Sequence, residues 1–451
     1  MTRALLSLAI LAAAVGASTP ATAATVDVQV RNNLYAPQQV EVAVGDTVRW
    51  TAIDGGHTVT ASDASFDSGL LTQSQTFEQT FTEDATLTYY CSVHAGMIGA
   101  VVVGDGGDLD PPEERPERTV PSEYPTIAAA LTGAAPYTIV NLQPGTYAGP
   151  VQILTPGLTL RGAGATRDEV VIDGGDALYA ALLLADHAEL ESLTVTGALF
   201  AGVNVAGVDG FRIEDVALAD NGRFGVLVER SRGGYVAGSV ATGHRTAGFQ
   251  VERCVECDTV FDGVVASGNL TGLAGLNAGG LVVKGSTFSG NGTGIALKTA
   301  ALYGDAADET APQRGSHVYG NVISGNSDRS ITPPTPTDRL DVATGAGVWI
   351  NGGSFNVVEG NEISGHGTYG VVITGLGAPP LENRIAGNVV TSSTVADLAW
   401  DGLGARNCFG GNQAGATEPP AAQTIYDCGL PATVGIAMPT VDATILDWAA
   451  I

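Results

Sequence analysis

Between Thr25 and Val103 the chain alternates between apolar and polar residues. Valines fill every second position in two runs, at 26, 28 and 30 and again at 40, 42 and 44. A period of two places successive side chains on opposite faces of a strand, so these runs predict half-buried β-strands. Turn residues separate the runs at Gly45-Asp46 and at Asp54-Gly55-Gly56. About 80 residues of short strands without a helical period predict a small β-sandwich.

A longer period takes over in the second part of the chain. A glycine directly precedes a large apolar residue at Gly202, Gly225, Gly248, Gly272, Gly294, Gly347 and Gly370. The first four intervals between these glycines are 23, 23, 24 and 22 residues. Gly-Asn pairs also recur, at 268–269, 290–291, 320–321, 360–361 and 387–388. Gly and Asn both tolerate left-handed backbone angles, which suits tight corners, so the period predicts stacked coils of a solenoid with one continuous apolar core.

The first residues have the layout of an export signal. A basic start at Arg3 precedes an apolar run over 4–15 and a small-residue exit that ends Ala21-Thr22-Ala23. This run is short for a membrane span, so we expect cleavage near Ala23 or Ala24 and export to the periplasm or the extracellular space. No later stretch is apolar for long enough to predict a membrane span.

These patterns divide the chain into consecutive parts. We expect a signal peptide over 1–23, the sandwich over 24–104, an acidic Pro/Gly-rich linker over 105–118, the repeat domain over 119–430 and a tail over 431–451. The Ala/Leu-rich stretch that starts at Ile127 is expected to be a helix that caps the solenoid. The long interval from Gly294 to Gly347 predicts inserted loops at 301–312 and 333–337, and such loops often carry binding sites.

The charge balance narrows the choice of partners. The chain has 47 Asp plus Glu against 20 Lys plus Arg, a formal net charge of −27. This net charge repels the phosphates of DNA and RNA and the surface of anionic membranes, so nucleic acid is excluded as the main partner. Apolar residues make up 44% of the chain, which is enough for packed cores.

The five cysteines are informative because exported proteins usually pair their thiols. Four of them lie beyond residue 250 and allow three pairings, of which sequence proximity favours Cys254 with Cys257 and Cys408 with Cys428. The Cys254-x-x-Cys257 pair could instead be redox-active, but no helix start follows that would lower a thiol pKa. Cys91 remains without a partner.

Cys91 lies in a group of residues that can bind a metal. Cys91, His94 and Met97 are three residues apart in one short segment between two predicted strands, and His57 lies upstream after a turn. Two imidazoles, a thiolate and a distant thioether are the ligand set of an electron-transfer copper site. Zinc is a poorer match, because it has no use for an axial methionine.

The other histidines are too few for larger copper centres. Only His187, His244, His317 and His366 remain, so the ligands of a trinuclear oxidase centre are missing. We therefore expect an electron carrier rather than an enzyme.

The first domain as a whole resembles the plastocyanin, amicyanin and halocyanin group of blue copper proteins, the cupredoxins. The resemblance rests on four segments in order: 47–50 (TVRW), 57–60 (HTVT), 66–69 (FDSG) and the run from Cys91 through His94 to Met97. It implies one type 1 copper ion per chain, bound by His57, Cys91, His94 and Met97. It also implies that electrons enter and leave the site through His94, and that the Cys91 sulfur provides the electronic coupling for their transfer. The acidic surface of this domain favours a basic redox partner.

The second domain resembles the right-handed parallel β-helix of the pectin-lyase-like class, with 144–147 (PGTY) and 158–162 (LTLRG) similar to its opening coils. The expected fold class is therefore all-β, a cupredoxin sandwich followed by a solenoid that acts as scaffold or docking surface. One alternative is a carbohydrate-binding or carbohydrate-active β-helix, for which His317, Asp338, Arg339 and Asp341 are candidates without a recognisable catalytic motif. Copper storage or delivery would use the same ligands as electron transfer.

Overall fold

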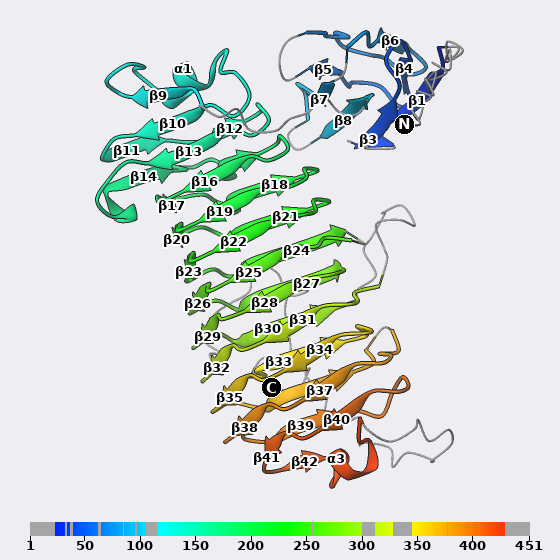
Figure 1. Cartoon of the computed structure of the whole chain (residues 1–451), viewed down its shortest axis with the longest axis vertical. Helices are drawn as coiled ribbons and strands as arrows, with labels where there is room; N and C mark the ends of the chain where they lie inside the picture. Colours follow the sequence, from blue (N-terminus) through cyan, green and yellow to red (C-terminus); the bar gives the residue numbers. More distant parts are fainter. Residues whose placement is uncertain are drawn as a thin grey trace, which may run out of the picture.

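The computed structural model describes residues 23–31, 34–36, 39–61, 65–83, 85–94, 97–104, 115–254, 256–299, 312–327, 345–376 and 378–428. The expected signal sequence, most of the expected linker, the C-terminal tail and most of both predicted insertions lie outside these ranges. Within them, no helix has the length and apolar character needed to cross a membrane. Nearly all regular structure is β, and the two predicted domains are both present (Figure 1).

The N-terminal domain is a sandwich of two four-stranded sheets. One sheet has the order β2 (Leu34–Ala36), β1 (Thr25–Arg31), β4 (Thr47–Ala52), β6 (Thr76–Thr80). The other has the order β3 (Gln39–Val42), β8 (Ile98–Val103), β7 (Ala85–Tyr90), β5 (Thr60–Ala61). The alternating valines of β1 and β3 point into the core, as predicted, with one exception: Val44 is 48% exposed, because the chain turns at Val44-Gly45 and the strand has already ended.

Aromatic side chains fill the centre of the sandwich. Trp50 and Tyr89 are fully buried, with ring centroids 5.1 Å apart, and Tyr35 meets the Tyr89 ring edge-on at 4.7 Å. Gly99 of β8 lies against the same ring, where a Cβ atom would come within 2.4 Å of Tyr89 Cζ. These contacts fix β7 and β8, the two strands that flank the segment from Cys91 to Met97.

The second domain is a solenoid of three parallel sheets with 12, 11 and 11 strands. The first sheet contains β9 (Glu117–Val120), β10 (Ile139–Leu142), β13 (Thr159–Gly162), β16 (Glu189–Glu191), β19 (Arg212–Glu214), β22 (Tyr235–Ala237), β25 (Val260–Asp262), β28 (Val282–Lys284), β31 (His317–Tyr319), β34 (Val357–Glu359), β37 (Arg384–Ala386) and β40 (Cys408–Gly410). The second contains β11 (Gly145–Ala148), β14 (Val170–Asp173), β17 (Thr194–Thr196), β20 (Ala217–Ala219), β23 (Val240–Thr242), β26 (Val265–Ser267), β29 (Thr287–Ser289), β32 (Val322–Ser324), β35 (Glu362–Ser364), β38 (Val389–Thr391) and β41 (Gln413–Ala414). The third contains β12 (Val151–Ile153), β15 (Tyr179–Leu183), β18 (Ala201–Ala206), β21 (Phe224–Glu229), β24 (Ala247–Cys254), β27 (Thr271–Ala278), β30 (Thr293–Lys298), β33 (Val348–Asn351), β36 (Tyr369–Thr374), β39 (Ala396–Trp400) and β42 (Thr417–Glu418).

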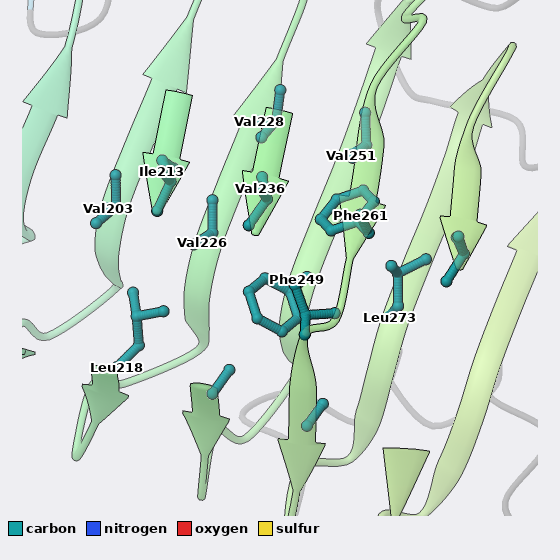
Figure 2. Packing of buried hydrophobic residues seen from close by; sticks show 14 of the residues in the cluster. Val203, Ile213, Leu218, Val226, Val228, Val236, Phe249, Val251, Phe261 and Leu273 are labelled. Carbon is teal, nitrogen blue, oxygen red and sulfur yellow. The ribbon is translucent and has the colours of Figure 1, made fainter. Parts of the chain in front are cut away.

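The sequence period corresponds to one coil of this solenoid. Val203, Val226, Phe249 and Leu273 are register partners in successive strands of the third sheet, and all four are completely buried. Figure 2 shows these side chains following one another along the interior. Stacking equivalent apolar positions at every coil gives the single continuous core that the glycine spacing predicts.

At the Gly-Asn corners the two residues have different roles. The glycines at 268, 290, 320, 360 and 387 have positive φ angles near 63°, as expected for a tight corner. The prediction that the asparagines share this conformation is wrong. They are buried, and each side chain bonds the next coil: Asn291 Oδ1 accepts from the backbone N–H and the amide of Asn269, and Asn291 Nδ2 donates to Asn326 Oδ1, all at 3.0 Å. The asparagines thus satisfy buried backbone groups that the corners leave unpaired.

Both described ends of the solenoid are closed. Helix α1 (Ile127–Leu131) begins where Thr126 Oγ1 accepts a hydrogen bond from Ala129 N–H, and it covers the first coils as predicted. At the other end, α3 (Ala422–Ile425) is followed by Cys428, which forms a disulfide with Cys408. A second disulfide joins Cys254 to Cys257 at the end of β24, so both favoured pairings are confirmed. A short 3-10 helix, η1 (Arg167–Glu169), lies between β13 and β14.

Candidate metal centre

The predicted metal-binding residues come from two parts of the sandwich. His57 follows the turn at Asp54-Gly55-Gly56 and is held by a β-bridge to Leu71. Cys91 comes directly after β7, and Met97 directly precedes β8. The intervening segment is closed by two backbone hydrogen bonds, from Cys91 N–H to the Met97 carbonyl at 2.9 Å and from Met97 N–H to the His94 carbonyl at 3.3 Å. One tight loop therefore presents residues 91, 94 and 97 from neighbouring positions.

The structure brings His57, Cys91 and His94 to one point. Their ligand atoms all lie within 4.8 Å of one another, and this is the only such group of at least three His, Cys, Asp or Glu residues in the described ranges. Cys91 Sγ is 3.5 Å from His94 Nδ1, and the two imidazole centroids are 4.7 Å apart. Met97 is 1% exposed and belongs with Cys91 to the apolar core of the domain.

Hydrogen bonding leaves one nitrogen of His57 free for a metal. Its Nε2 lies 2.9 Å from Asp54 Oδ1, so this nitrogen carries the proton and donates to the carboxylate. Its Nδ1 is buried and has no hydrogen-bond partner. A buried nitrogen lone pair costs free energy when it is left unpaired, and a metal ion would satisfy it. The residues present thus fit a soft-ligand copper site.

A second set of contacts holds the thiol side of the site. The Thr58 backbone N–H donates to Cys91 Sγ at 3.3 Å, and Thr58 Oγ1 accepts from the Ser92 N–H at 2.8 Å. The Thr58 carbonyl in turn accepts from the Tyr35 hydroxyl. Burial raises the pKa of Tyr35 far above its usual range, so this hydroxyl stays protonated and keeps donating. A hydrogen bond to the sulfur stabilises a thiolate and restrains its position.

Sequence reasoning did not identify these supporting residues. The sequence pattern places Asp54 in a turn and gives it no further role, although a carboxylate three residues before a histidine is a signal for such a support. Thr58 acts through its backbone, so no side-chain pattern reveals its role.

Of the solenoid residues that the sequence offers for carbohydrate chemistry, only His317 lies within the described ranges. Asp338, Arg339 and Asp341 lie outside the described residues, while His317 lies on the outer face of the first sheet. His317 Nε2 is 3.0 Å from Glu359 Oε1, and Arg384 donates to Glu359 Oε2 at 2.8 Å. The structure thus pairs His317 with Glu359, which in turn accepts from Arg384. Sequence reasoning missed Glu359 and Arg384 because they lie on the next two coils, 42 and 67 residues away in the chain.

Comparison with known proteins identifies the class of each domain. Residues 23–104 match the copper binding proteins of the plastocyanin/azurin family, and residues 186–405 match the right handed beta helix region family. The N-terminal domain is therefore plastocyanin-like, and it is joined to a right-handed β-helix.

Several known proteins are similar to this chain over part of its length. A halocyanin from Natronomonas pharaonis is 40% identical over 82 residues, which cover 16% of this chain and 50% of the halocyanin. An oxidized mutant of amicyanin is 30% identical, with 17% of this chain and 80% of amicyanin covered and a TM-score of 0.17. A purple cupredoxin from Nitrosopumilus maritimus is 29% identical, with 18% and 99% covered and a TM-score of 0.16. The matched part of the chain thus spans about half the length of this halocyanin.

Proposed function

We propose that the N-terminal domain binds one type 1 copper ion through His57, Cys91, His94 and Met97 and transfers single electrons. The observation that carries this proposal is the convergence of three ligand atoms within 4.8 Å around a buried imidazole nitrogen that has no protein partner. When bound, copper would supply a one-electron couple between Cu(I) and Cu(II). Similarity to halocyanin and amicyanin supports the same role.

The protein contributes a fixed ligand geometry. Asp54 orients the His57 ring, the Thr58 N–H restrains the Cys91 sulfur, and two backbone hydrogen bonds close the loop on Met97. Because these contacts are independent of the metal oxidation state, the ligands need to move little when an electron arrives or leaves. Burial of Cys91 and Met97 keeps water from the sulfur ligands, which also favours a small reorganisation.

The open side of the site lies at the tip of the loop. Val93 is 54% exposed and His94 is half-buried, whereas His57 is 2% exposed. An electron-transfer partner would therefore approach His94 and not His57. The positive charge of Arg49 is already paired, because the side chain lies 2.6 Å from Glu78 and 3.5 Å from Asp27. The surface of the domain is therefore acidic and suits a basic partner.

Export completes the proposal. The order of a basic start, an apolar run and a small-residue exit in residues 1–23 supports a cleaved signal peptide and a periplasmic or extracellular protein. Sequencing the N-terminus of the mature protein tests this part. We expect it to begin at Ala24 or an adjacent residue, and an N-terminus at Met1 would contradict export by this route.

Spectroscopy of the copper-loaded full chain tests the central proposal. We expect an intense visible charge-transfer band that reductant bleaches and oxidant restores. Replacing the thiolate in Cys91→Ser should abolish the band, whereas the matched histidine control His317→Ala, on the solenoid, should leave it intact. Copper binding without a reversible band would favour storage or delivery instead.

A second function is favoured by a hollow on the outer face of the first sheet. A shallow, open depression of about 650 Å³ is lined by Tyr319, Glu359 and Arg384 together with Ala386 and the glycines at 320, 360, 387, 410 and 411. The glycines have no side chains to fill the hollow. The Tyr319 ring offers a flat apolar surface, and the ion pair of Glu359 and Arg384 can form hydrogen bonds with hydroxyl groups. We propose that this hollow binds a glycan.

Adjacent strands repeat every 4.8 Å or so along the face, which is close to the length of one sugar unit. Binding to a panel of neutral and uronic-acid polysaccharides tests the idea. Tyr319→Ala should weaken retention and Phe355→Ala, an exposed aromatic outside the hollow, should not. No binding and no new sugar ends across the panel would contradict it.

A further inference from the structure

The copper domain and the solenoid touch through apolar side chains. Leu182, Leu184 and Ala206 form a small buried cluster at the N-terminal end of the third sheet, and Tyr90 of the copper domain packs against it. In Figure 1 the strands β7 and β8 lie on the side of the copper domain that is nearest to these coils. This contact joins residues that are more than 90 positions apart in the sequence.

The cluster lies on the outer face of the solenoid. In β15, Ala181 and Leu183 point inward and are fully buried in the main core, so Leu182 points outward. Leu182 and Leu184 are nevertheless only 5% exposed. Tyr90 packs against these outward leucines together with Leu154 and Tyr179 of the solenoid itself.

On the copper domain, the contact lies at the base of the metal-binding loop. Tyr89 points into the sandwich core, so the next residue, Tyr90, points out of the same sheet. Tyr90 immediately precedes Cys91, and its strand partner Ile98 immediately follows Met97. The Tyr90 side of the loop is thus the side turned toward the solenoid, while Val93 at the tip is 54% exposed.

We propose that the copper domain is docked on the solenoid through Tyr90 and the cluster of Leu182, Leu184 and Ala206, in one fixed orientation. The interface covers the base of the loop and leaves the tip open. The β-helix then fixes the orientation of the copper domain, and so the direction in which the open side of the loop faces. This inference depends on packing alone and holds whether or not the site carries electrons.

A charge introduced into the cluster tests the docking in the full chain. Leu182→Asp would bury a carboxylate in the interface and should separate the domains, whereas Leu178→Asp, an exposed leucine of the same coil, is the matched control. Small-angle X-ray scattering should show one compact particle for wild type and for Leu178→Asp, and a larger radius of gyration for Leu182→Asp. Cleavage by a glutamyl endopeptidase after Glu113 or Glu114 should accelerate about ten-fold or more in Leu182→Asp and should keep the wild-type rate in Leu178→Asp.

A substitution in the copper domain distinguishes loss of the contact from a local folding defect in the solenoid. Tyr90→Asp should reproduce the expansion and the faster cleavage, with the far-ultraviolet circular dichroism of all variants unchanged. Scattering from wild type that requires two independently moving domains would overturn the proposal. Identical cleavage rates for Leu182→Asp, Tyr90→Asp and Leu178→Asp would overturn it as well.

Discussion

The hydrogen bond from His57 to Asp54 offers a direct way to weaken the metal site without removing a ligand. Asp54→Ala removes the acceptor that lies 2.9 Å from His57 Nε2 and that selects the tautomer with a free Nδ1. The His57 ring would then be free to rotate and to exchange tautomers, so its lone pair would face the other ligands only part of the time. Copper affinity should therefore fall while the ligand set remains complete.

The size of this effect follows from the environment of the pair. Loss of a partner that orients a metal-bound histidine typically reduces metal affinity about 10- to 100-fold. The His57 side chain is 3% exposed, but that of Asp54 is 45% exposed, so solvent screens the interaction and water can replace part of it. We therefore expect the lower half of that range, about 10- to 30-fold.

Competition against a chelator of known affinity measures the change. The control is Asp67→Ala, which removes an exposed carboxylate that bonds Thr60 and Gly69 and does not contact a predicted ligand. Copper affinity should be unchanged in this control. An Asp54→Ala protein with wild-type affinity would refute the reasoning, and so would an equal loss in Asp67→Ala.

Three further predictions concern stability. Asn291→Ala removes the acceptor for two donors of Asn269 and should lower the free energy of unfolding by about 2 to 5 kcal/mol in denaturant titrations, against less than about 0.5 for the surface control Asn141→Ala. Gly99→Ala places a methyl group against the fixed Tyr89 ring and should cost about 1 to 3 kcal/mol, and an unchanged denaturation midpoint would contradict this. Burial lowers the pKa of His244 and of His366 to about 4, so the unfolded chain binds more protons between pH 4 and about 6.5 and stability should decline as the pH falls through that window. His244→Asn, which continues the asparagine ladder, should flatten this decline, and an unaltered pH profile would contradict the assignment.

Sequence pattern predicts the architecture well because both domains repeat simple units. The alternating valines of β1 and β3 predict strands, and the spacing of Gly202, Gly225 and Gly248 predicts the coil. The pattern fails at Val44, because alternation does not show where a strand gives way to a turn. It also assigned the corner asparagines to a backbone role, because a ladder of buried amides depends on the coil above and below and not on local sequence.

The residues of the metal centre also differ in whether the sequence reveals their role. Cys91, His94 and Met97 are visible because three ligand types are close together in the chain, and His57 is found through its place in the family pattern. Asp54, Thr58 and Tyr35 are not visible as supports, because they act through geometry that forms only after folding. The packing of Tyr90 against the cluster of Leu182, Leu184 and Ala206 has no sequence signal at all, since it joins two domains through ordinary apolar residues.

The two domains of the chain contribute different features. The sandwich supplies a metal site with restrained ligands, and the solenoid supplies a stiff body with an open, polar face around Tyr319 and Glu359. If the copper domain is docked as proposed, the loop tip faces one fixed direction relative to the solenoid.

Titration of the metal-free full chain with Cu(II), followed by visible absorption, tests the central claim most directly. The claim predicts saturation at one copper ion per chain and an intense band that bleaches and recovers reversibly. The band should be absent in Cys91→Ser and present in His317→Ala. A wild-type protein without this band, or a band that survives Cys91→Ser, would contradict it.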